Sequence, residues 1–130
     1  IIPTLTQPIL GICLGLQLLC QHTEEGDTSC LGVFPARVRK FPAQLRVPHM
    51  GWNELSRTDE TCLLAGVPPS DDFYYVHSYY AETCAHTVAE CNYTVPFSAI
   101  LQKDNFFATQ FHPEKSAGSG EKLLQNFLEL

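Results

Sequence analysis

The first twenty residues show an apolar run followed by a change in hydrophobic spacing. Residues 7–12 form a short apolar segment that is typical of a buried strand. Over residues 13–20 the apolar positions shift to helical spacing, and Leu14, Leu18 and Leu19 share a predicted face. The pattern therefore predicts a strand, a tight turn and a helix, with a cysteine at the corner.

The middle of the chain alternates between predicted strands and polar segments. Residues 23–29 and 57–61 are predicted loops. Residues 33–41 alternate in polarity and predict a strand interrupted at Pro35, and residues 45–52 predict another extended segment. Four stronger strand signals lie at residues 73–76, 87–93, 98–102 and 106–111.

An amphipathic helix is predicted at the end of the chain. Ser119 is a suitable N-cap, and Glu121 favours the first turn of a helix. The predicted buried stripe consists of Leu123, Leu124, Phe127 and Leu128. A strand, an elbow, a helix, several antiparallel-looking strands and a closing helix together predict one α/β domain over residues 1–130, with an added β-rich part.

Composition and charge exclude several classes of protein. The 130 residues are 45% hydrophobic and 17% charged, which suits one globular domain with a substantial core. The formal net charge of −6 argues against a nucleic-acid partner, because proteins that bind phosphate backbones are usually basic. The longest apolar stretch, residues 9–16, is shorter than the roughly 20 residues of a membrane-spanning helix. No basic residue precedes Arg37, and the chain starts at Ile1, so we expect no signal peptide and a processed chain or a fragment.

The six cysteines permit three interpretations. An even count allows disulfides, although small disulfide-stabilised domains have weaker cores than this composition indicates. Cys62, Cys84, His86 and Cys91 lie close enough in sequence to consider a zinc site, but they contain no Cys-x-x-Cys pair. We favour free thiols in a cytosolic protein, and we predict neither a metal nor a cofactor.

The corner cysteine fits the pattern of a nucleophile elbow. Gly11-Ile-Cys13-Leu-Gly15 places Cys13 on a strained strand-to-helix turn, where flanking glycines allow close passage of the backbone. A helix N-terminus favours a thiolate, and the amide of Leu14 is placed to donate to an oxyanion. The same pattern also occurs as a simple turn with a buried cysteine. The strand before it and the helix after it favour the nucleophile.

A cysteine nucleophile needs a base and a group that orients the base. His112 and Glu114 follow the last predicted strand and are two residues apart, so in extended backbone they project to the same side. An exposed ion pair is the alternative interpretation of these two residues. Two other histidines, His22 and His86, are predicted at the surface. His49 and His77 lie among aromatic residues, and each is a structural, a binding or a rival basic residue.

Four motifs resemble those of class I (triad) glutamine amidotransferases. Gly-Ile-Cys-Leu-Gly-Leu-Gln at residues 11–17 and Gln-Phe-His-Pro-Glu-Lys-Ser at residues 110–116 are similar to the two signatures of that superfamily. Val-Pro-His-Met-Gly-Trp-Asn at residues 47–53 and Phe-Tyr-Tyr-Val-His-Ser-Tyr-Tyr at residues 73–80 resemble the glutaminase subunit of imidazole glycerol phosphate synthase, of histidine biosynthesis. The similarity extends from about residue 8 to the end of the chain.

The resemblance implies a flavodoxin-like three-layer fold with a mixed sheet, and a Cys-His-Glu triad. Cys13 would attack the carboxamide of glutamine, His112 would protonate the departing ammonia, and Glu114 would orient His112. Water would then release glutamate from the thioester. The family uses no cofactor, and a cytoplasmic location is implied.

The same resemblance implies a glutamine pocket and a protein partner. Gln17 is similar to a residue that contacts glutamine, and Ser78 and Tyr79 to the segment that holds its amino-acid end. In this family the ammonia passes to a (β/α)₈-barrel cyclase subunit that makes imidazole glycerol phosphate. Residues expected at the interface of such a heterodimer are His49, Trp52, Tyr74 and Lys115.

The sequence departs from the family before the elbow. Family members have several tens of residues there, including a Gly-rich loop that supplies a second oxyanion donor, whereas only twelve residues precede Cys13. We therefore expect an N-terminally truncated domain whose oxyanion hole keeps only the Leu14 amide. Since the loss of one donor costs about 10²–10³ in rate, we expect little activity from the 130-residue chain.

Three other functions are compatible with parts of this pattern. Another class I amidotransferase would share the outer two motifs but not the middle two. A non-catalytic fragment that binds a partner would explain the short N-terminal part but not the intact triad. A cysteine hydrolase of a different amide would keep the chemistry, and Gln17 and the tyrosine-rich strand weigh mildly against it.

Overall fold

The structure is a computed structural model that describes residues 1–42, 46–68 and 70–130. Its largest sheet is mixed, because one pair of strands is parallel and the other pairs are antiparallel. The order of its strands is β1 (Ile9–Ile12), β11 (Phe106–Thr109), β10 (Val95–Lys103), β9 (Thr87–Tyr93) and β6 (Arg57–Thr58). The parallel pair is β1 with β11, and Gly11 lies opposite Ala108 in their register.

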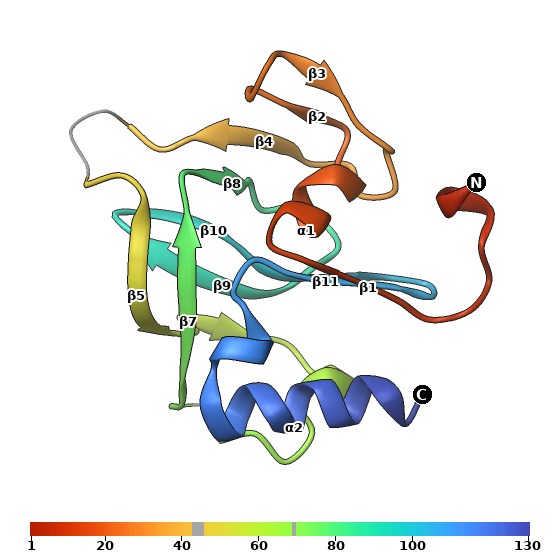
Figure 1. The fold of residues 1–130 in the computed structure, drawn as a ribbon, viewed down its shortest axis with the longest axis vertical. Helices are drawn as coiled ribbons and strands as arrows, with labels where there is room; N and C mark the ends of the chain where they lie inside the picture. Colours follow the sequence, from red (N-terminus) through yellow and green to blue (C-terminus); the bar gives the residue numbers. More distant parts are fainter. Residues whose placement is uncertain (43–45, 69) are drawn as a thin grey trace.

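Two smaller sheets extend from this one (Figure 1). A four-stranded sheet has the order β3 (Thr28–Ser29), β2 (His22–Thr23), β4 (Arg37–Lys40) and β8 (Tyr79–Ala81). A two-stranded antiparallel sheet joins β5 (His49–Glu54) to β7 (Asp72–His77). The three short 3₁₀ helices are η1 (Ile2–Thr4), η2 (Cys62–Leu64) and η3 (Pro113–Lys115).

Helices lie on opposite sides of the β1–β11 pair. On one side Phe106 and Ala108 share a buried cluster with α1 (Leu14–Leu19). On the other side Phe107 belongs to the cluster that includes α2 (Ala117–Leu128). Neighbouring residues of a strand face opposite sides of the sheet. Because both sides of β11 are covered, all its residues are buried. Figure 1 shows the resulting three layers, with α1 above the strands and α2 below them.

Three of the four strong strand signals are confirmed over their full length, and the fourth and the weaker ones were wrong in their extent. β9 matches the predicted residues 87–93, and β7 and β10 contain the predicted segments. The strand predicted over residues 33–41 is limited to β4, and β11 ends before residue 111. Both predicted loops contain short strands, β2 and β3 in the first and β6 in the second. Residue 45, predicted to begin an extended segment, lies outside the described residues.

Both helices differ in detail from the prediction. α2 begins at Ala117, so Ser119 is not its N-cap, and the Ser119 hydroxyl instead donates to the carboxylate of Asp71. Leu123 is buried, whereas Leu128 is 80% exposed and does not belong to the buried stripe. In α1, Leu14 and Leu18 are exposed, and the buried positions are Leu16, Gln17 and Leu19. Neither α-helix among the described residues is long and apolar enough to cross a membrane.

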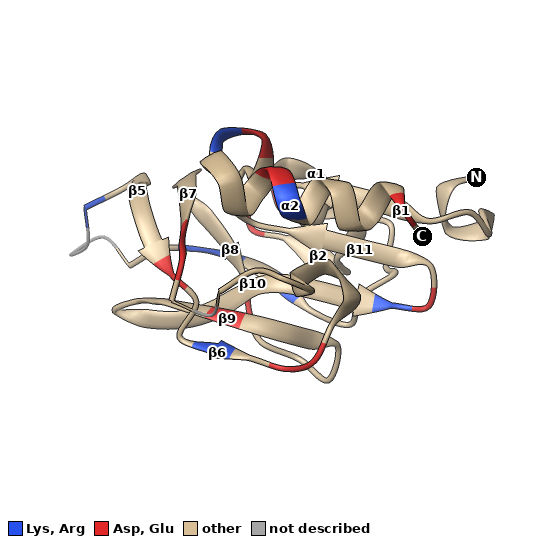
Figure 2. Ribbon diagram, turned by 90° about the horizontal axis from the view of Figure 1, so that it is seen from below, with Lys and Arg blue, Asp and Glu red and all other residues tan. Residues whose placement is uncertain are grey.

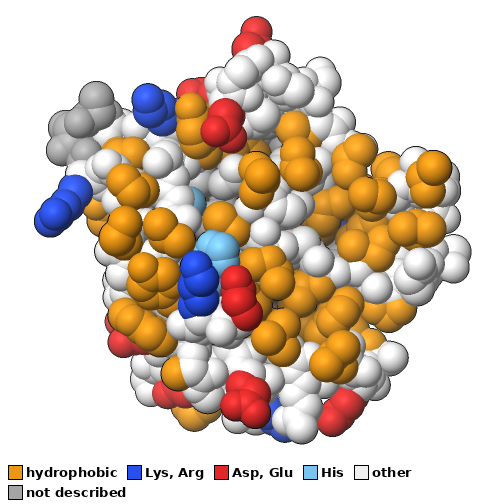
Figure 3. All heavy atoms as spheres, viewed as in Figure 1, with side chains coloured by type: hydrophobic (Ala, Val, Ile, Leu, Met, Phe, Trp, Pro, Cys, Tyr) orange, Lys and Arg blue, Asp and Glu red, His pale blue; other side chains and the backbone are white. Residues whose placement is uncertain are grey.

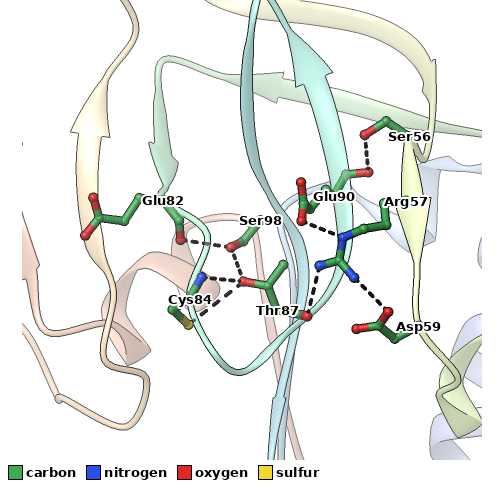
Figure 4. Close-up of polar contacts among 8 residues, drawn as sticks. All are labelled: Ser56, Arg57, Asp59, Glu82, Cys84, Thr87, Glu90 and Ser98. Atoms are coloured by element: carbon green, nitrogen blue, oxygen red, sulfur yellow. Dashed lines mark hydrogen bonds and ion pairs between the residues drawn. The ribbon is translucent and has the colours of Figure 1, made fainter.

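The residues considered for zinc are dispersed. Cys91 is buried in the core, Cys62 is exposed on η2, and the sulfur of Cys84 accepts a hydrogen bond from Thr87. Figure 4 shows that the Thr87 hydroxyl also joins Ser98, which ties β9 to β10. Across the described ranges, no group of three or more potential ligands is arranged to hold a metal ion, and all six cysteines are unpaired.

The charged residues are spread over separate elements of the fold (Figure 2). The clearest cluster is at β6, where Arg57 contacts Glu90 at 2.6 Å and Asp59 at 2.7 Å. These ion pairs are largely exposed and contribute little to stability. The contact between Arg57 and Glu90 joins the short edge strand β6 to β9.

Candidate active site

Cys13 occupies the predicted elbow between β1 and α1. Its φ of 53° lies in the left-handed region, which is unusual for a residue other than glycine and is typical of a nucleophile elbow. The backbone N–H of Cys13 donates to the Thr109 carbonyl at 2.8 Å, so β11 continues to pair with the chain as it turns. The strained turn is therefore held in place by the sheet.

Gly11 is required at the elbow, and Gly15 is not. A Cβ atom added at Gly11 would lie 2.8 Å from the carbonyl carbon of Gly15, which is a backbone clash. A Cβ atom added at Gly15 would meet nothing within 4 Å. The expectation that both glycines permit close passage is therefore confirmed only for Gly11, where β1 passes under the first turn of α1.

The sulfur of Cys13 is part of a hydrogen-bonded environment. It donates to the Val76 carbonyl at 3.8 Å and accepts from Nε2 of Gln110 at 3.6 Å. Burial raises the pKa of the Cys13 thiol above its ordinary value, and the charge of Glu114 raises it further. The Leu14 N–H, Gln110 and Lys115 act in the opposite direction and lower this pKa. The resting group is therefore a thiol, contrary to the expectation of a thiolate favoured by the short helix α1, and it needs a base.

His112 and Glu114 form the predicted contact, with 2.8 Å between Nδ1 and Oε2. The geometry differs from the prediction, because residues 113–115 form the 3₁₀ helix η3 rather than extended backbone. His112 is fixed on both sides. The backbone N–H of His112 donates to the Tyr74 carbonyl at 2.9 Å. The backbone carbonyl of His112 accepts from the Ser116 hydroxyl at 2.6 Å.

Strand β7 brings the nucleophile and the histidine together. The Tyr74 carbonyl accepts from His112, and the Val76 carbonyl, two residues further along β7, accepts from Cys13. The contact with Glu114 uses Nδ1 of His112, which leaves Nε2 as the nitrogen for proton transfer. No direct hydrogen bond joins Cys13 to His112 in the part of the chain that the structure describes. Such catalytic contacts commonly tighten only when substrate binds.

A cavity of about 230 Å³ opens beside the nucleophile. Its lining contains Cys13 and Leu14 from the elbow and the three predicted substrate-binding residues, Gln17, Ser78 and Tyr79. Its remaining lining residues, Glu25 and His77, were not assigned to it from the sequence. Glu25 follows β2 in a polar turn that gave no periodic signal, so only the tertiary fold reveals its position.

Gln17 is already hydrogen-bonded within the protein. Its Nε2 donates to the Tyr79 carbonyl at 2.9 Å and to Oε1 of Gln110 at 3.1 Å. Gln110, which is fully buried, continues the network to the sulfur of Cys13. Gln17 therefore joins the wall of the cavity to the nucleophile, and Gln110 is a site residue that sequence reasoning missed.

The residues predicted to contact a partner lie on and behind one face. Trp52 of β5 is 51% exposed and stands opposite Tyr74 of β7, with ring centroids 5.7 Å apart. Exposed Lys115 lies in η3, next to Glu114. His49 is only 3% exposed and lies behind this face. Figure 3 shows hydrophobic side chains over the region of β5 and β7.

The chain is similar in sequence to curated proteins of one kind. It is 50% identical over 133 residues to the imidazole glycerol phosphate synthase subunit HisH of Bacteroides thetaiotaomicron, covering 100% of this chain and 67% of that protein. It is 46% identical over 130 residues to the protein of the same name from Pasteurella multocida, covering 99% of this chain and 66% of that one. The chain thus spans about two thirds of the length of these relatives.

Solved structures confirm the fold. A protein from Thermoplasma acidophilum that is assigned to GMP synthase superposes with a TM-score of 0.73 at 23% identity, over 98% of this chain and 59% of that one. A glutamine amidotransferase from Thermotoga maritima gives a TM-score of 0.62 at 18% identity, over 94% and 47% of the two chains. The family described as "Glutamine amidotransferase class-I" matches residues 2–130. With its cysteine elbow and its three-layer fold around a mixed sheet, the chain belongs to the class I glutamine amidotransferase family.

Proposed function

We propose that the chain is the glutaminase part of imidazole glycerol phosphate synthase and hydrolyses glutamine through Cys13, His112 and Glu114. The observation that supports this most directly is the attachment of both Cys13 and His112 to β7 through carbonyls two residues apart. The names of relatives at about 50% identity support the choice among class I amidotransferases. Structures below 25% identity support only the fold and do not favour another pathway.

The proposed reaction starts from a protonated thiol. His112 Nε2 takes the proton of Cys13 as the sulfur attacks the carboxamide carbon of glutamine. The same nitrogen gives the proton to the departing amine, so that ammonia leaves and a thioester remains. Water, deprotonated by His112, then attacks the thioester carbon. The bond between this carbon and the Cys13 sulfur breaks, glutamate leaves, and His112 returns the proton to the sulfur. Glu114 stabilises the imidazolium that forms in each half of the reaction.

The Leu14 amide is the proposed oxyanion donor. Its N–H lowers the pKa of the Cys13 thiol through a hydrogen bond, which supports a position for this donor near the sulfur. A donor so placed stabilises the negative charge that develops on the carboxamide oxygen. Leu14 is the first of the six residues of α1, so the rest of the helix holds this N–H in position.

Recognition of glutamine is assigned to the cavity beside the elbow. Its volume of about 230 Å³ suits a small amino acid, and the carboxylate of Glu25 in its lining is complementary to an α-ammonium group. Ser78 and Tyr79 line the same cavity and are proposed to hold the amino-acid end of glutamine. Gln17 is proposed to contact the substrate and to fix this wall.

A (β/α)₈-barrel cyclase subunit is the proposed partner and the receiver of ammonia. The outward side of β5 and β7 has Met50 and Trp52 in register with Val76 and Tyr74, which gives an apolar stripe. The stripe lies directly beside the segment that contains His112, because Tyr74 bonds both that residue and Ser116. Trp52, Tyr74 and Lys115 are therefore proposed interface residues, with His49 behind them.

A glutamine-analogue electrophile tests the proposal. The chain would be treated with and without a cyclase partner, and all six cysteines would be mapped by peptide analysis. We expect labelling confined to Cys13 that is lost in His112→Ala. Absence of labelling at Cys13 under both conditions, or equal labelling of several cysteines, would refute an assembled glutaminase site and favour a non-catalytic fragment.

A further inference from the structure

A line of hydrogen bonds crosses the core from β5 to the candidate glutamine cavity. Nδ2 of Asn53 lies 2.9 Å from Nε2 of His49, and Nδ1 of His49 lies 3.0 Å from Nε2 of His77. Nδ1 of His77 then lies 2.7 Å from the carbonyl oxygen of Tyr79, which lines the cavity. The two histidines face each other across the register of β5 and β7.

The atoms at the two ends of this line allow its hydrogen bonds to be donated in only one direction. A carbonyl oxygen can only accept, so His77 donates from Nδ1 and, as a neutral ring, accepts at Nε2. His49 must then donate from Nδ1 and accept at Nε2 from the amide of Asn53. Each ring is therefore held in a single tautomer. A proton added to either ring would leave two N–H groups facing each other.

The surroundings keep both rings neutral. His49 and His77 are 3% and 6% exposed, and burial lowers the pKa of each to about 4. The ring of His49 stacks between Tyr75, at a centroid distance of 5.1 Å, and Tyr93, at 4.1 Å. The donors and acceptors of these rings are thus fixed by packing as well as by hydrogen bonds.

The network continues beyond the carbonyl to the nucleophile. The Tyr79 oxygen accepts a second hydrogen bond from Gln17, whose amide also donates to Gln110, and Gln110 donates to the sulfur of Cys13. The carbonyl between His77 and Gln17 is therefore held from both sides. A shift of this carbonyl would therefore move the wall of the cavity.

We propose that His49 and His77 are positioning residues that hold the Tyr79 carbonyl, and through it the glutamine cavity, in a binding-competent arrangement. This inference rests on the proposed glutaminase function. It assigns to the two histidines neither acid–base chemistry nor contact with glutamine. Their effect is on how well the cavity binds, with little effect on the reactivity of the thiol itself.

Paired substitutions distinguish a hydrogen-bonding role from a space-filling one. The amide nitrogen of asparagine occupies nearly the place of Nδ1 of histidine, whereas that of glutamine reaches the place of Nε2. His77→Asn keeps the donor to the Tyr79 carbonyl, and His77→Gln removes it. At position 49, likewise, His49→Asn keeps the donor to His77 and His49→Gln removes it. His86→Gln, in the turn before β9, is the matched control.

Labelling of Cys13 by a glutamine-analogue electrophile gives the readout. In His77→Gln the analogue concentration for half-maximal labelling is expected to rise about tenfold, as for one lost hydrogen bond, with the maximal rate changed less than about threefold. His77→Asn and His86→Gln are expected within about threefold of the unchanged protein. Alkylation of Cys13 by iodoacetamide, which needs no cavity, should be alike in all four proteins.

Each failure has its own meaning. If the unchanged protein does not label at Cys13, the proposed glutaminase function fails and this inference fails with it. If the unchanged protein labels but His77→Gln labels equally well, or Asn and Gln impair labelling equally, only the positioning role is overturned. Should His77→Gln melt too early to assay, His49→Gln against His49→Asn must show the same ordering, and its absence overturns the role.

Discussion

At the scale of single residues, the charge around Cys13 balances opposing demands. Glu114 orients His112, but its negative charge also raises the pKa of the Cys13 thiol. Lys115, the next residue, lowers the same pKa. The carboxylate of Glu114 therefore disfavours the Cys13 thiolate, and the charge of Lys115 offsets part of this effect. In the proposed mechanism, Cys13 is therefore ionised mainly when His112 takes its proton.

Neutralising these two charges should move the ionisation of Cys13 in opposite directions. In Glu114→Gln the pH midpoint of alkylation by iodoacetamide should fall, because the charge that raises the thiol pKa is removed. In Lys115→Gln the midpoint should rise. Glutamine hydrolysis in Glu114→Gln should nevertheless fall roughly 10²-fold, since the base loses its orienting partner. Midpoints that move in the same direction in both variants would contradict this electrostatic account.

At the scale of elements, the site depends on close backbone packing at two glycines. Gly11 lets β1 pass beneath α1, and Gly120 lets α2 lie against η3, where a Cβ atom would be 1.9 Å from the Pro113 carbonyl oxygen. One contact places Cys13, and the other places the segment of His112 and Glu114. Neither contact depends on side-chain chemistry, so the catalytic geometry follows from how closely these elements approach.

The two glycines of the elbow should respond differently to alanine. Gly11→Ala should lower the free energy of unfolding by about 1–3 kcal/mol, because its Cβ meets the backbone at Gly15. Gly15→Ala, inside α1 with open space around it, should be neutral or stabilising by up to about 1 kcal/mol. Urea unfolding of both variants measures this difference. Equal destabilisation by both substitutions would contradict this account, because only Gly11→Ala creates a backbone clash.

The elements that could be predicted were those with a strong local signal. β9 was located to the residue because seven residues alternate between buried and less buried positions. The two-residue strands β2, β3 and β6 are too short to show a period. Ser119 resembled an N-cap because its type suits one, yet its hydroxyl is used by Asp71, which is 48 positions away in sequence. Such a choice between local and distant partners is decided only by the fold.

At the scale of the whole molecule, the candidate site also divides into residues with a local sequence signal and contacts that only the fold creates. Cys13, His112 and Glu114 could be proposed as catalytic residues because each lies in a short motif with its own local signal. The contacts from His77 to His49, and from Gln17 to Tyr79 and Gln110, join residues 28, 62 and 93 positions apart. No spacing rule reports such contacts. The network that supports the cavity, unlike the triad, became visible only when β5, β7 and α1 were assembled.

The buried histidine pair should make stability depend on pH. Unfolded histidines bind a proton at about pH 6.5, whereas burial lowers the pKa of His49 and His77 to about 4. Between these values the unfolded state binds more protons, so stability is fully present above about pH 6.5 and is lost as the pH falls toward 4. We expect a loss on the order of 3 kcal/mol for each of the two histidines, measured by urea unfolding across this range. A pH-independent free energy of unfolding would show that the rings are not held neutral.

The apolar stripe on β5 and β7 should show its role in affinity for a cyclase partner rather than in stability. Trp52 is half exposed and contacts Tyr74 edge-on, so its removal leaves no buried cavity in the isolated chain. Trp52→Ala should therefore shift the melting temperature little and weaken partner binding by about 10- to 100-fold, as for an aromatic interface anchor.

Leu31→Ala is the matched control for this prediction. Leu31 is also a large exposed apolar residue, at 43%, but it lies after β3 and beside a different cavity from that of Trp52. Its removal should leave partner affinity unchanged within about twofold, because only side chains on the docking face lose contacts. Titration of each variant against the cyclase gives the dissociation constants. Equal weakening by both substitutions would place the partner elsewhere. No weakening by Trp52→Ala would remove the β5–β7 face from the proposed interface while leaving the active site on β7 unaffected.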